Sequence, residues 1–222
     1  LQPFSIPIMS ARRAVLRPEY AFAKRTLDAL LAALGLVIAS PVMLITAIAI
    51  KAYDGGPVFF VQDRCTINGK VFKIHKFRSM IENAEKDGEV IPATDDDARI
   101  TPVGKIIRKT RLDELPQFFD ILIGNMSVVG PRPERVEHVE KYVEEVPEFT
   151  YRMKVKGGLT GYAQIYGKYN TSAYDKLKLD LMYIQNYSIL LDLRLILMTV
   201  KIMFIKDSTE GFEEIKPSEK KD

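Results

Sequence analysis

The sequence is poor in the residues that form disulfides and soft-metal sites. Its 222 residues include one cysteine, Cys65, two histidines, His75 and His138, and no tryptophan. A single thiol cannot form an internal disulfide, so nothing indicates an oxidising compartment. Two histidines exclude a histidine-rich metal site. The formal net charge is only +3, and we therefore expect no nucleic-acid partner.

The length suits one domain with short appendages. Residues 1–19 contain three prolines and no helical period, and we interpret them as an arm or linker. The chain begins with Leu1 instead of methionine, which is compatible with a remnant of a longer parent. We expect residues 20–206 to form a membrane-anchored domain and residues 207–222 to form a solvated tail.

A long uncharged segment is the strongest physical feature. Residues 29–50 carry no charge, and as one helix they would extend roughly 33 Å, enough to cross a membrane. Two details favour a hairpin that enters and leaves by one face. Ser40-Pro41 lies in the middle, where proline breaks or kinks a helix and serine can bond a freed carbonyl. Both flanks are basic, as is typical of cytoplasmic segments. The segment alone leaves both topologies open.

The remaining pattern predicts an α+β fold that is mostly helical. Residues 58–61 and 71–74 favour strands around Asn68-Gly69, which indicates a small β-hairpin. Helices are predicted over residues 103–111, 115–123, 134–146 and 172–205, and a flexible loop over residues 157–161. Residues 187–205 are apolar but carry three charges, which favours an interfacial helix or one packed on the domain.

Two adjacent carboxylates, Asp113 and Glu114, are the first candidates for chemistry. They follow four basic residues, Lys105, Arg108, Lys109 and Arg111, and precede Pro116, which fits the first turn of a helix. An ionised aspartate there could be a nucleophile toward phosphate, with cations offsetting the like-charge repulsion. The alternative is simple helix capping, because acidic residues favour first turns.

Several cations are candidates for phosphate binding. Arg132 lies between Pro131 and Pro133, which restrict the backbone and would fix a guanidinium for bidentate contacts. Lys76 and Arg78 add positive charge near the apolar segment. A solvated surface turn, for Arg132, and attraction to lipid headgroups, for Lys76 and Arg78, are the alternatives.

Eight segments in order resemble the bacterial sugar transferase family, the monotopic polyprenyl-phosphate phosphoglycosyl transferases. The likeness extends over about residues 20–206. The segments are Lys24–Asp28, Ser40-Pro41, Gly56–Arg64, Lys76–Met80, Ile100–Gly104, Leu112–Gln117, Asn125–Pro133 and Gly158–Gln164.

The resemblance implies a re-entrant helix over residues 29–50, broken at Ser40-Pro41. It places the protein in the bacterial inner membrane, among membrane lipids, with its catalytic domain on the cytoplasmic face. It also implies that Asp113, supported by Glu114, attacks a UDP-sugar and releases UMP, and that polyprenyl (undecaprenyl) phosphate then takes the sugar phosphate. This would be the first membrane step of exopolysaccharide or capsule synthesis.

The family likeness also assigns ligands. Mg²⁺ would bind at Asp113, while Arg108 and Arg132, together with Lys76 and Arg78, would hold phosphate. Galactose or glucose is expected as the sugar. Whether the protein forms a homo-oligomer is left open. Two other functions remain alternatives: a non-catalytic scaffold or regulator of the same fold, and a glycosyltransferase that releases UDP.

Overall fold

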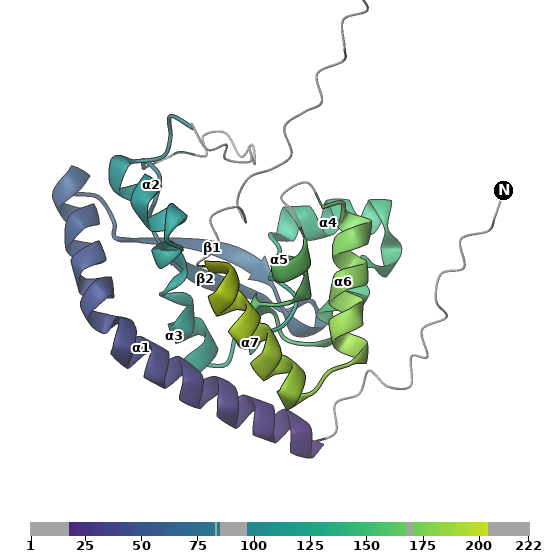
Figure 1. Cartoon of the computed structure of the whole chain (residues 1–222). Coiled ribbons are helices and arrows are strands. Elements are labelled where there is room, and N and C mark those ends of the chain that lie inside the picture. Colours follow the sequence, from purple (N-terminus) through teal and green to yellow (C-terminus); the bar gives the residue numbers. More distant parts are fainter. Residues whose placement is uncertain (1–17, 83, 85–96, 168–170, 204–222) are drawn as a thin grey trace, which may run out of the picture.

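The structure, a computed structural model, describes residues 18–82, 84, 97–167 and 171–203 (Figure 1). The predicted tail, and the arm except for Pro18 and Glu19, lie outside these residues. The helices are α1 (Pro18–Asp54), α2 (Pro102–Lys109), α3 (Gln117–Leu122), α4 (Val136–Glu145), α5 (Tyr162–Tyr166), α6 (Ala173–Gln185) and α7 (Ile189–Met203). Three 3₁₀ segments are η2 (Ile67–Gly69), η4 (Leu112–Glu114) and η5 (Pro147–Lys154). The strands are β1 (Phe59–Cys65), β2 (Val71–Phe77), β3 (Ser127–Val129) and β4 (Gly158–Thr160).

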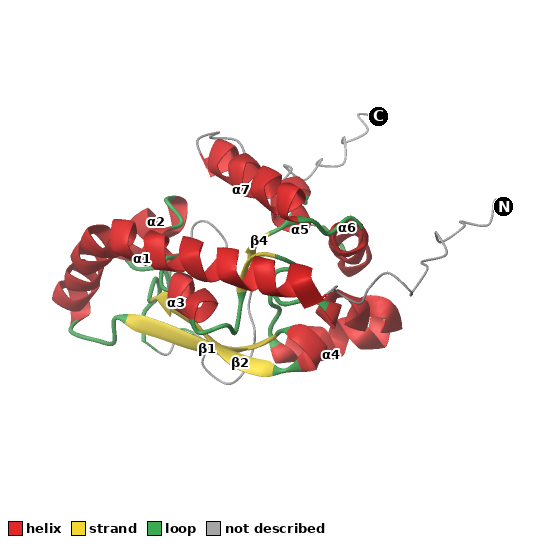
Figure 2. Ribbon diagram, turned by 90° about the horizontal axis from the view of Figure 1, so that it is seen from below, coloured by secondary structure: helices red, strands yellow, loops and turns green. Residues whose placement is uncertain are grey.

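The predicted mostly helical class and its small β-hairpin are confirmed. Strands β1 and β2 pair antiparallel, with Phe59 opposite Phe77 and Cys65 opposite Val71. Asn68 and Gly69 adopt φ of 55° and 73°, the left-handed conformation that reverses the chain. Seen from below, the hairpin and α7 lie on opposite faces of the molecule (Figure 2).

The predicted flexible loop at residues 157–161 is wrong, because this segment contains strand β4. Strand β4 pairs parallel with β3, with Ser127 opposite Gly158. Glycine is required by the close approach of the two backbones: a Cβ on Gly158 would lie 2.1 Å from the Gly130 nitrogen. The glycines that suggested flexibility therefore permit tight backbone packing.

Helix α1 continues through Pro41, so the predicted break at Ser40-Pro41 is not an interruption of the helix. The helix curves along its length instead (Figure 1). Pro41 has no N–H for the Val37 carbonyl, and the Ser40 hydroxyl donates to that carbonyl at 2.8 Å. This bond compensates the backbone and explains how a proline is tolerated in mid-helix.

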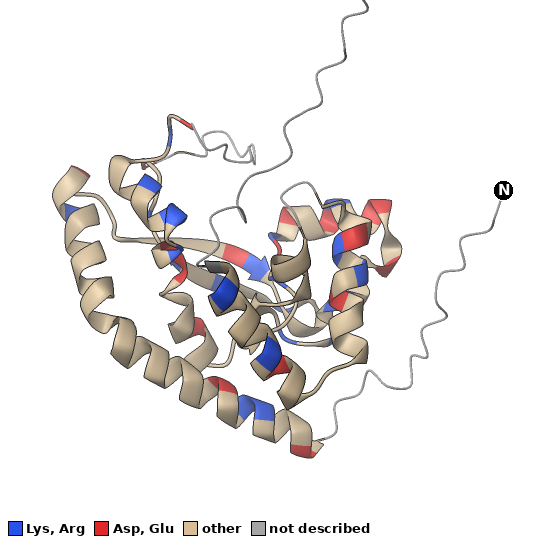
Figure 3. Ribbon diagram, viewed as in Figure 1, with Lys and Arg blue, Asp and Glu red and all other residues tan. Residues whose placement is uncertain are grey.

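Both ends of α1 are attached to the rest of the domain. Near the start, Lys24 and Asp28 are buried, and Arg25 donates to the Ile121 and Leu122 carbonyls at 2.7 and 2.6 Å. Near the end, Ile50 packs in a cluster with Phe77 and Ile107. The charged residues of α1 accordingly gather at its two ends in Figure 3.

The middle of α1 is left largely uncovered. The helix is long and apolar enough to cross a membrane, yet only 11% of its most apolar 18-residue window is buried inside the described protein. Large apolar side chains such as Leu34, Val37, Ile38 and Ile45 are exposed. A core helix of a water-soluble protein would have these side chains covered, so this surface matches a lipid environment.

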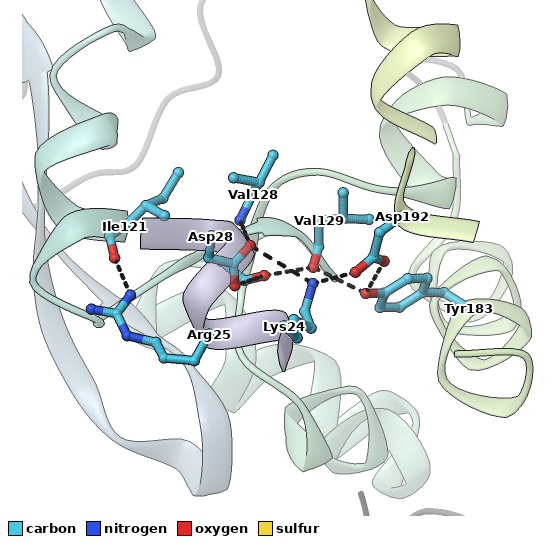
Figure 4. A network of polar contacts seen from close by, with 9 residues as sticks. Lys24, Arg25, Asp28, Ile121, Val128, Val129, Tyr183 and Asp192 are labelled. Atoms are coloured by element: carbon cyan, nitrogen blue, oxygen red, sulfur yellow. Dashed lines mark hydrogen bonds and ion pairs between the residues drawn. The ribbon is translucent and has the colours of Figure 1, made fainter. Parts of the chain in front are cut away.

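The predicted long C-terminal helix is two helices, α6 and α7. Asp192 shows how residues 187–205, predicted to be interfacial or packed on the domain, contact the rest of the protein. It is buried, accepts from the Lys24 ammonium at 2.6 Å, and accepts from the Tyr183 hydroxyl at 2.8 Å (Figure 4). Arg194 and Lys201 are exposed, so α7 packs on the domain through its acidic residue.

Candidate active site

The two adjacent carboxylates lie on η4, a single turn between α2 and α3. Arg111 precedes the turn with φ of 55°, a conformation rare for a residue with a side chain. Leu112 and Leu115 pack against the second half of α1, beside Ile50. The first residue of α3 follows Pro116, and neither η4 nor α3 has a side-chain cap. Helix capping therefore does not explain Asp113.

Glu114 is held between two cations from distant segments. Lys76 of β2 donates to Glu114 Oε1 at 3.3 Å. Arg132, from the loop after β3, contacts both carboxylate oxygens, with Nη1 to Oε2 at 3.3 Å. Although burial opposes ionisation, Arg132 and Lys76 hold the pKa of Glu114 well below its usual range. Glu114 is thus a fixed anion that organises the cations.

Asp113 has the opposite environment. Among the residues that the structure describes, its carboxylate makes no recorded hydrogen bond or ion pair. Burial raises its pKa from 3.8 to about 6, with Glu114 adding repulsion, while Lys76, Arg108 and Arg132 act in the other direction. Asp113 is therefore mostly ionised at neutral pH and unpaired, as a nucleophile needs to be. Two neighbouring acids whose pKa values are driven apart are typical of a functional site.

A buried network holds the loop that carries Arg132. Arg152 of η5 donates to the Arg132 carbonyl at 2.8 Å and to Asp180 of α6 at 2.8 Å. Glu134, two residues after Arg132, accepts from Lys176 at 2.8 Å. These long-range contacts therefore hold the backbone around Arg132 together with the two flanking prolines. No local sequence signal predicts them.

The predicted site residues do not all come together. Asp113, Glu114, Lys76 and Arg132 form one cluster, and Arg108 is close enough to lower the pKa of Asp113. Arg78 instead forms an ion pair with Asp54, which ties the end of α1 to the segment after β2. Its contacts do not reach the carboxylate pair, and its role in phosphate binding stays a prediction.

Arg64 is a site residue that the predicted set omitted. Burial and the nearby Arg132 lower its pKa to about 10, and it donates to the Pro133 carbonyl at 3.2 Å. Arg64 and Lys76 lie on the same face of the β1–β2 hairpin, because Arg64 pairs with Phe72, four residues before Lys76. The Asn68-Gly69 turn fixes this register, so strand alternation could have identified Arg64.

The donor set at the site is limited for a metal ion. Within the described ranges, no cluster of three or more His, Cys, Asp or Glu residues could hold one. Mg²⁺, however, commonly takes one or two carboxylates and completes its shell with water and substrate phosphate. Glu114 is occupied by its cations, which leaves Asp113 as the free carboxylate. The residues therefore fit Mg²⁺ only together with a phosphate ligand.

A cavity of about 540 Å³ borders the same site. Its walls come mainly from α1 and α7, with smaller contributions from β4, α5 and α3, and Arg111 and Glu114 are among its lining residues. The site thus combines an anionic pair, a group of cations and an apolar space beside the exposed helix. This combination suits a membrane-associated domain that binds an anionic ligand beside an apolar surface.

Comparison with known proteins gives the family. Residues 19–206 match the family described as bacterial sugar transferase, and the chain belongs to it. A UDP-N-acetylgalactosamine-undecaprenyl-phosphate N-acetylgalactosaminephosphotransferase of Aeromonas hydrophila is 44% identical over 187 residues, 83% of this chain and 44% of that protein. A UDP-glucose:undecaprenyl-phosphate glucose-1-phosphate transferase of Klebsiella pneumoniae is 47% identical over 190 residues, 83% of this chain and 41% of that protein.

The relatives differ in length. The chain spans about two fifths of the two transferases above. An exopolysaccharide production protein of Sinorhizobium fredii is 37% identical over 199 residues, 83% of this chain and 87% of that protein. The described domain therefore corresponds to part of some relatives and to most of another.

Proposed function

We propose that the protein transfers a sugar-1-phosphate from a UDP-sugar to undecaprenyl phosphate or a similar polyprenyl phosphate. The observation that carries the proposal is the difference between two adjacent, half-buried carboxylates: Glu114 is bound by cations, whereas Asp113 is unpaired and mostly ionised at neutral pH. The names of the relatives support the donor and acceptor classes. Because those relatives act on different sugars, the hexose is not assigned.

In the proposed first step, an Asp113 oxygen attacks the β-phosphorus of the UDP-sugar. A bond forms from that oxygen to phosphorus, the bond to the bridging oxygen breaks, and UMP leaves with the electron pair. Arg132 and Lys76, oriented by Glu114, bind the phosphate oxygens as charge develops. Mg²⁺, bound by Asp113 and the diphosphate, would supply further neutralisation of the like charges.

In the proposed second step, a phosphate oxygen of the polyprenyl phosphate attacks the same phosphorus. The bond from phosphorus to the Asp113 oxygen breaks, which regenerates the carboxylate and yields a polyprenyl diphosphate sugar. Two displacements through a covalent intermediate divide one difficult transfer into easier steps. The product would start exopolysaccharide or capsule assembly.

Product analysis tests the proposed reaction. We expect the wild-type protein, supplied with Mg²⁺ and a short polyprenyl phosphate, to release UMP from at least one of a panel of UDP-sugars. Release of UDP would instead indicate a glycosyltransferase that moves sugar without phosphate. No nucleotide release from any donor, by a protein verified as folded, would support the scaffold alternative.

We also propose that α1 is re-entrant, with both ends on the cytoplasmic face of the inner membrane. Its first turns contact α3, β3 and α7, and its last turns contact α2 and β2, all within one domain. A straight spanning helix would separate these ends by the membrane thickness. The curvature of α1 and its exposed apolar middle fit a helix that dips into one leaflet (Figures 1 and 3).

Cysteine labelling in spheroplasts checks this topology. Cys65 is buried, so a Cys65→Ser background can carry one new cysteine at exposed Glu19 or exposed Ala52. We expect neither cysteine to react with an impermeant maleimide until the membrane is permeabilised, when both react. The protein that keeps Cys65 and carries no new cysteine serves as the control for labelling of the buried thiol. Opposite accessibility of the two positions would establish a spanning helix.

A further inference from the structure

The cavity beside the carboxylate pair has an unusual composition for a site of phosphate chemistry. Most of its wall is aliphatic or aromatic, contributed by α1, by Leu115 and Phe118 near α3, and by α7. The wall on α1 includes Leu34 and Ile38, two of the exposed apolar residues of the proposed membrane helix. The space is therefore continuous with the surface that we assign to lipid, and an apolar chain can enter it sideways from the leaflet.

Polar groups on the wall are few, and most are already engaged. Thr160 and Thr199 bond to each other through their hydroxyls at 2.6 Å, and Glu114 is bound by Arg132 and Lys76. The Gln164 amide is buried with no hydrogen-bond partner in the described part of the chain. A buried amide without a partner is costly, so Gln164 indicates that a ligand atom completes its bonding.

We propose that this cavity holds the first isoprene units of the polyprenyl phosphate acceptor, with its phosphate near Arg111 and Glu114. The inference rests on the proposed function and adds the acceptor's binding site. A lipid of this class is apolar along its chain and anionic at one end. The cavity wall is mostly apolar, and its charged lining residues are Arg111 and Glu114, the latter bound by Lys76 and Arg132. Its volume also lies within the roughly 300–1,000 Å³ of ordinary ligand sites.

The position explains how the acceptor reaches the intermediate. Glu114 lines the cavity and adjoins Asp113 in η4, so a phosphate at the cavity's polar end lies next to the loaded aspartate. The walls on α1 and α7 would orient the polyprenyl chain. Its phosphate would then be held in position to attack the intermediate. The UDP-sugar needs the cations and is not required to occupy the apolar space.

Paired tryptophan substitutions on α7 test the site. Val200 lines the cavity and is 49% exposed, whereas Leu197, one turn away, is 71% exposed and is not a lining residue. We expect Val200→Trp to raise the KM for undecaprenyl phosphate at least tenfold, because the indole occupies the chain's space. Leu197→Trp should leave that KM within twofold of wild type. Loading of Asp113 from UDP-sugar should be unchanged in both variants.

A second pair on α1 keeps the test decisive if Val200→Trp fails to fold. Leu34 lines the cavity, while Leu30, one turn earlier, is exposed and does not. Leu34→Trp and Leu30→Trp should reproduce the contrast. If folded variants of lining residues load normally and keep the wild-type KM for the acceptor, the inference is wrong, and the cavity then holds ordinary lipid. Absence of loading in the wild type would instead overturn the proposed function.

Discussion

Replacing Asp113 with asparagine abolishes loading with sugar phosphate and reduces UMP release at least about a thousandfold, the scale of effect seen when a nucleophile is removed. Asparagine has the same shape but cannot form the acyl phosphate. The measurement is intact-protein mass spectrometry after incubation with UDP-sugar, together with a nucleotide-release assay. Full turnover by Asp113→Asn would end the covalent mechanism.

The same substitution should leave the protein as stable as wild type or more stable. Burial of the ionised, unpaired Asp113 opposes folding at neutral pH by on the order of 2–3 kcal/mol, because its pKa is raised to about 6. An amide removes this cost. A protein that loses activity while its melting temperature holds or rises has lost chemistry and not structure.

Glu114→Gln is the matched control, because it changes the neighbouring carboxylate in the same way. It leaves Lys76 and Arg132 close together without their anion, and because these side chains are only partly buried we expect the loss of their hydrogen bonds to cost about 1–3 kcal/mol. Its melting temperature should therefore fall as activity falls. Equal stability changes in the Asp113→Asn and Glu114→Gln variants would contradict the different roles assigned to the two acids.

The elements of the fold that sequence reasoning found were those with strong local signals. The Asn68-Gly69 turn predicted the hairpin, and the uncharged segment predicted the long apolar helix α1. Strand β4 was missed because its three residues make parallel pairs with a distant strand, and its glycines look like a loop. Pro41 was predicted to break the helix, but α1 continues through it, with the Ser40 hydroxyl bonded to the Val37 carbonyl.

The carboxylate pair was identifiable from its position among basic residues, but the division of roles was not. Which acid is bound depends on Lys76 and Arg132, which come from two distant segments. Arg78 matched the same charge pattern as Lys76, yet it pairs with Asp54 at the end of α1. Sequence proximity to a cationic segment cannot distinguish these cases, because Arg78 lies one residue beyond the end of β2 and its partner Asp54 comes from the distant end of α1.

The buried pair of Lys24 and Asp192 connects the start of α1 to α7 (Figure 4). Both side chains are almost fully buried, and Asp192 also accepts from Tyr183. The adjoining Asp28 accepts from Ser127 Oγ at 2.8 Å and from the Val128 N–H at 3.0 Å, which extends the network to β3. This network connects α1 to α7, the two helices that contribute most of the residues lining the cavity.

Lys24→Met should lower the free energy of unfolding by about 3–5 kcal/mol, because it leaves a buried carboxylate without its cation. For a chain of this size, that loss corresponds to a fall in melting temperature of roughly 6–20 °C, measured by circular dichroism in detergent. Arg194→Met removes an exposed charge from the same helix as Asp192 and should change stability by less than about 0.5 kcal/mol.

The double variant Lys24→Met/Asp192→Asn distinguishes the effect of the ion pair from the separate effects of the two side chains. Asparagine still accepts from Tyr183 but carries no charge, so the double variant should be more stable than Lys24→Met alone. Recovery of stability with a weakened affinity for the acceptor would show that the ion pair sets the spacing of α1 and α7 as well as holding them together. If the two substitutions simply add, Lys24 and Asp192 are not coupled, and the packing of α1 on α7 must come from the apolar contacts around Leu195.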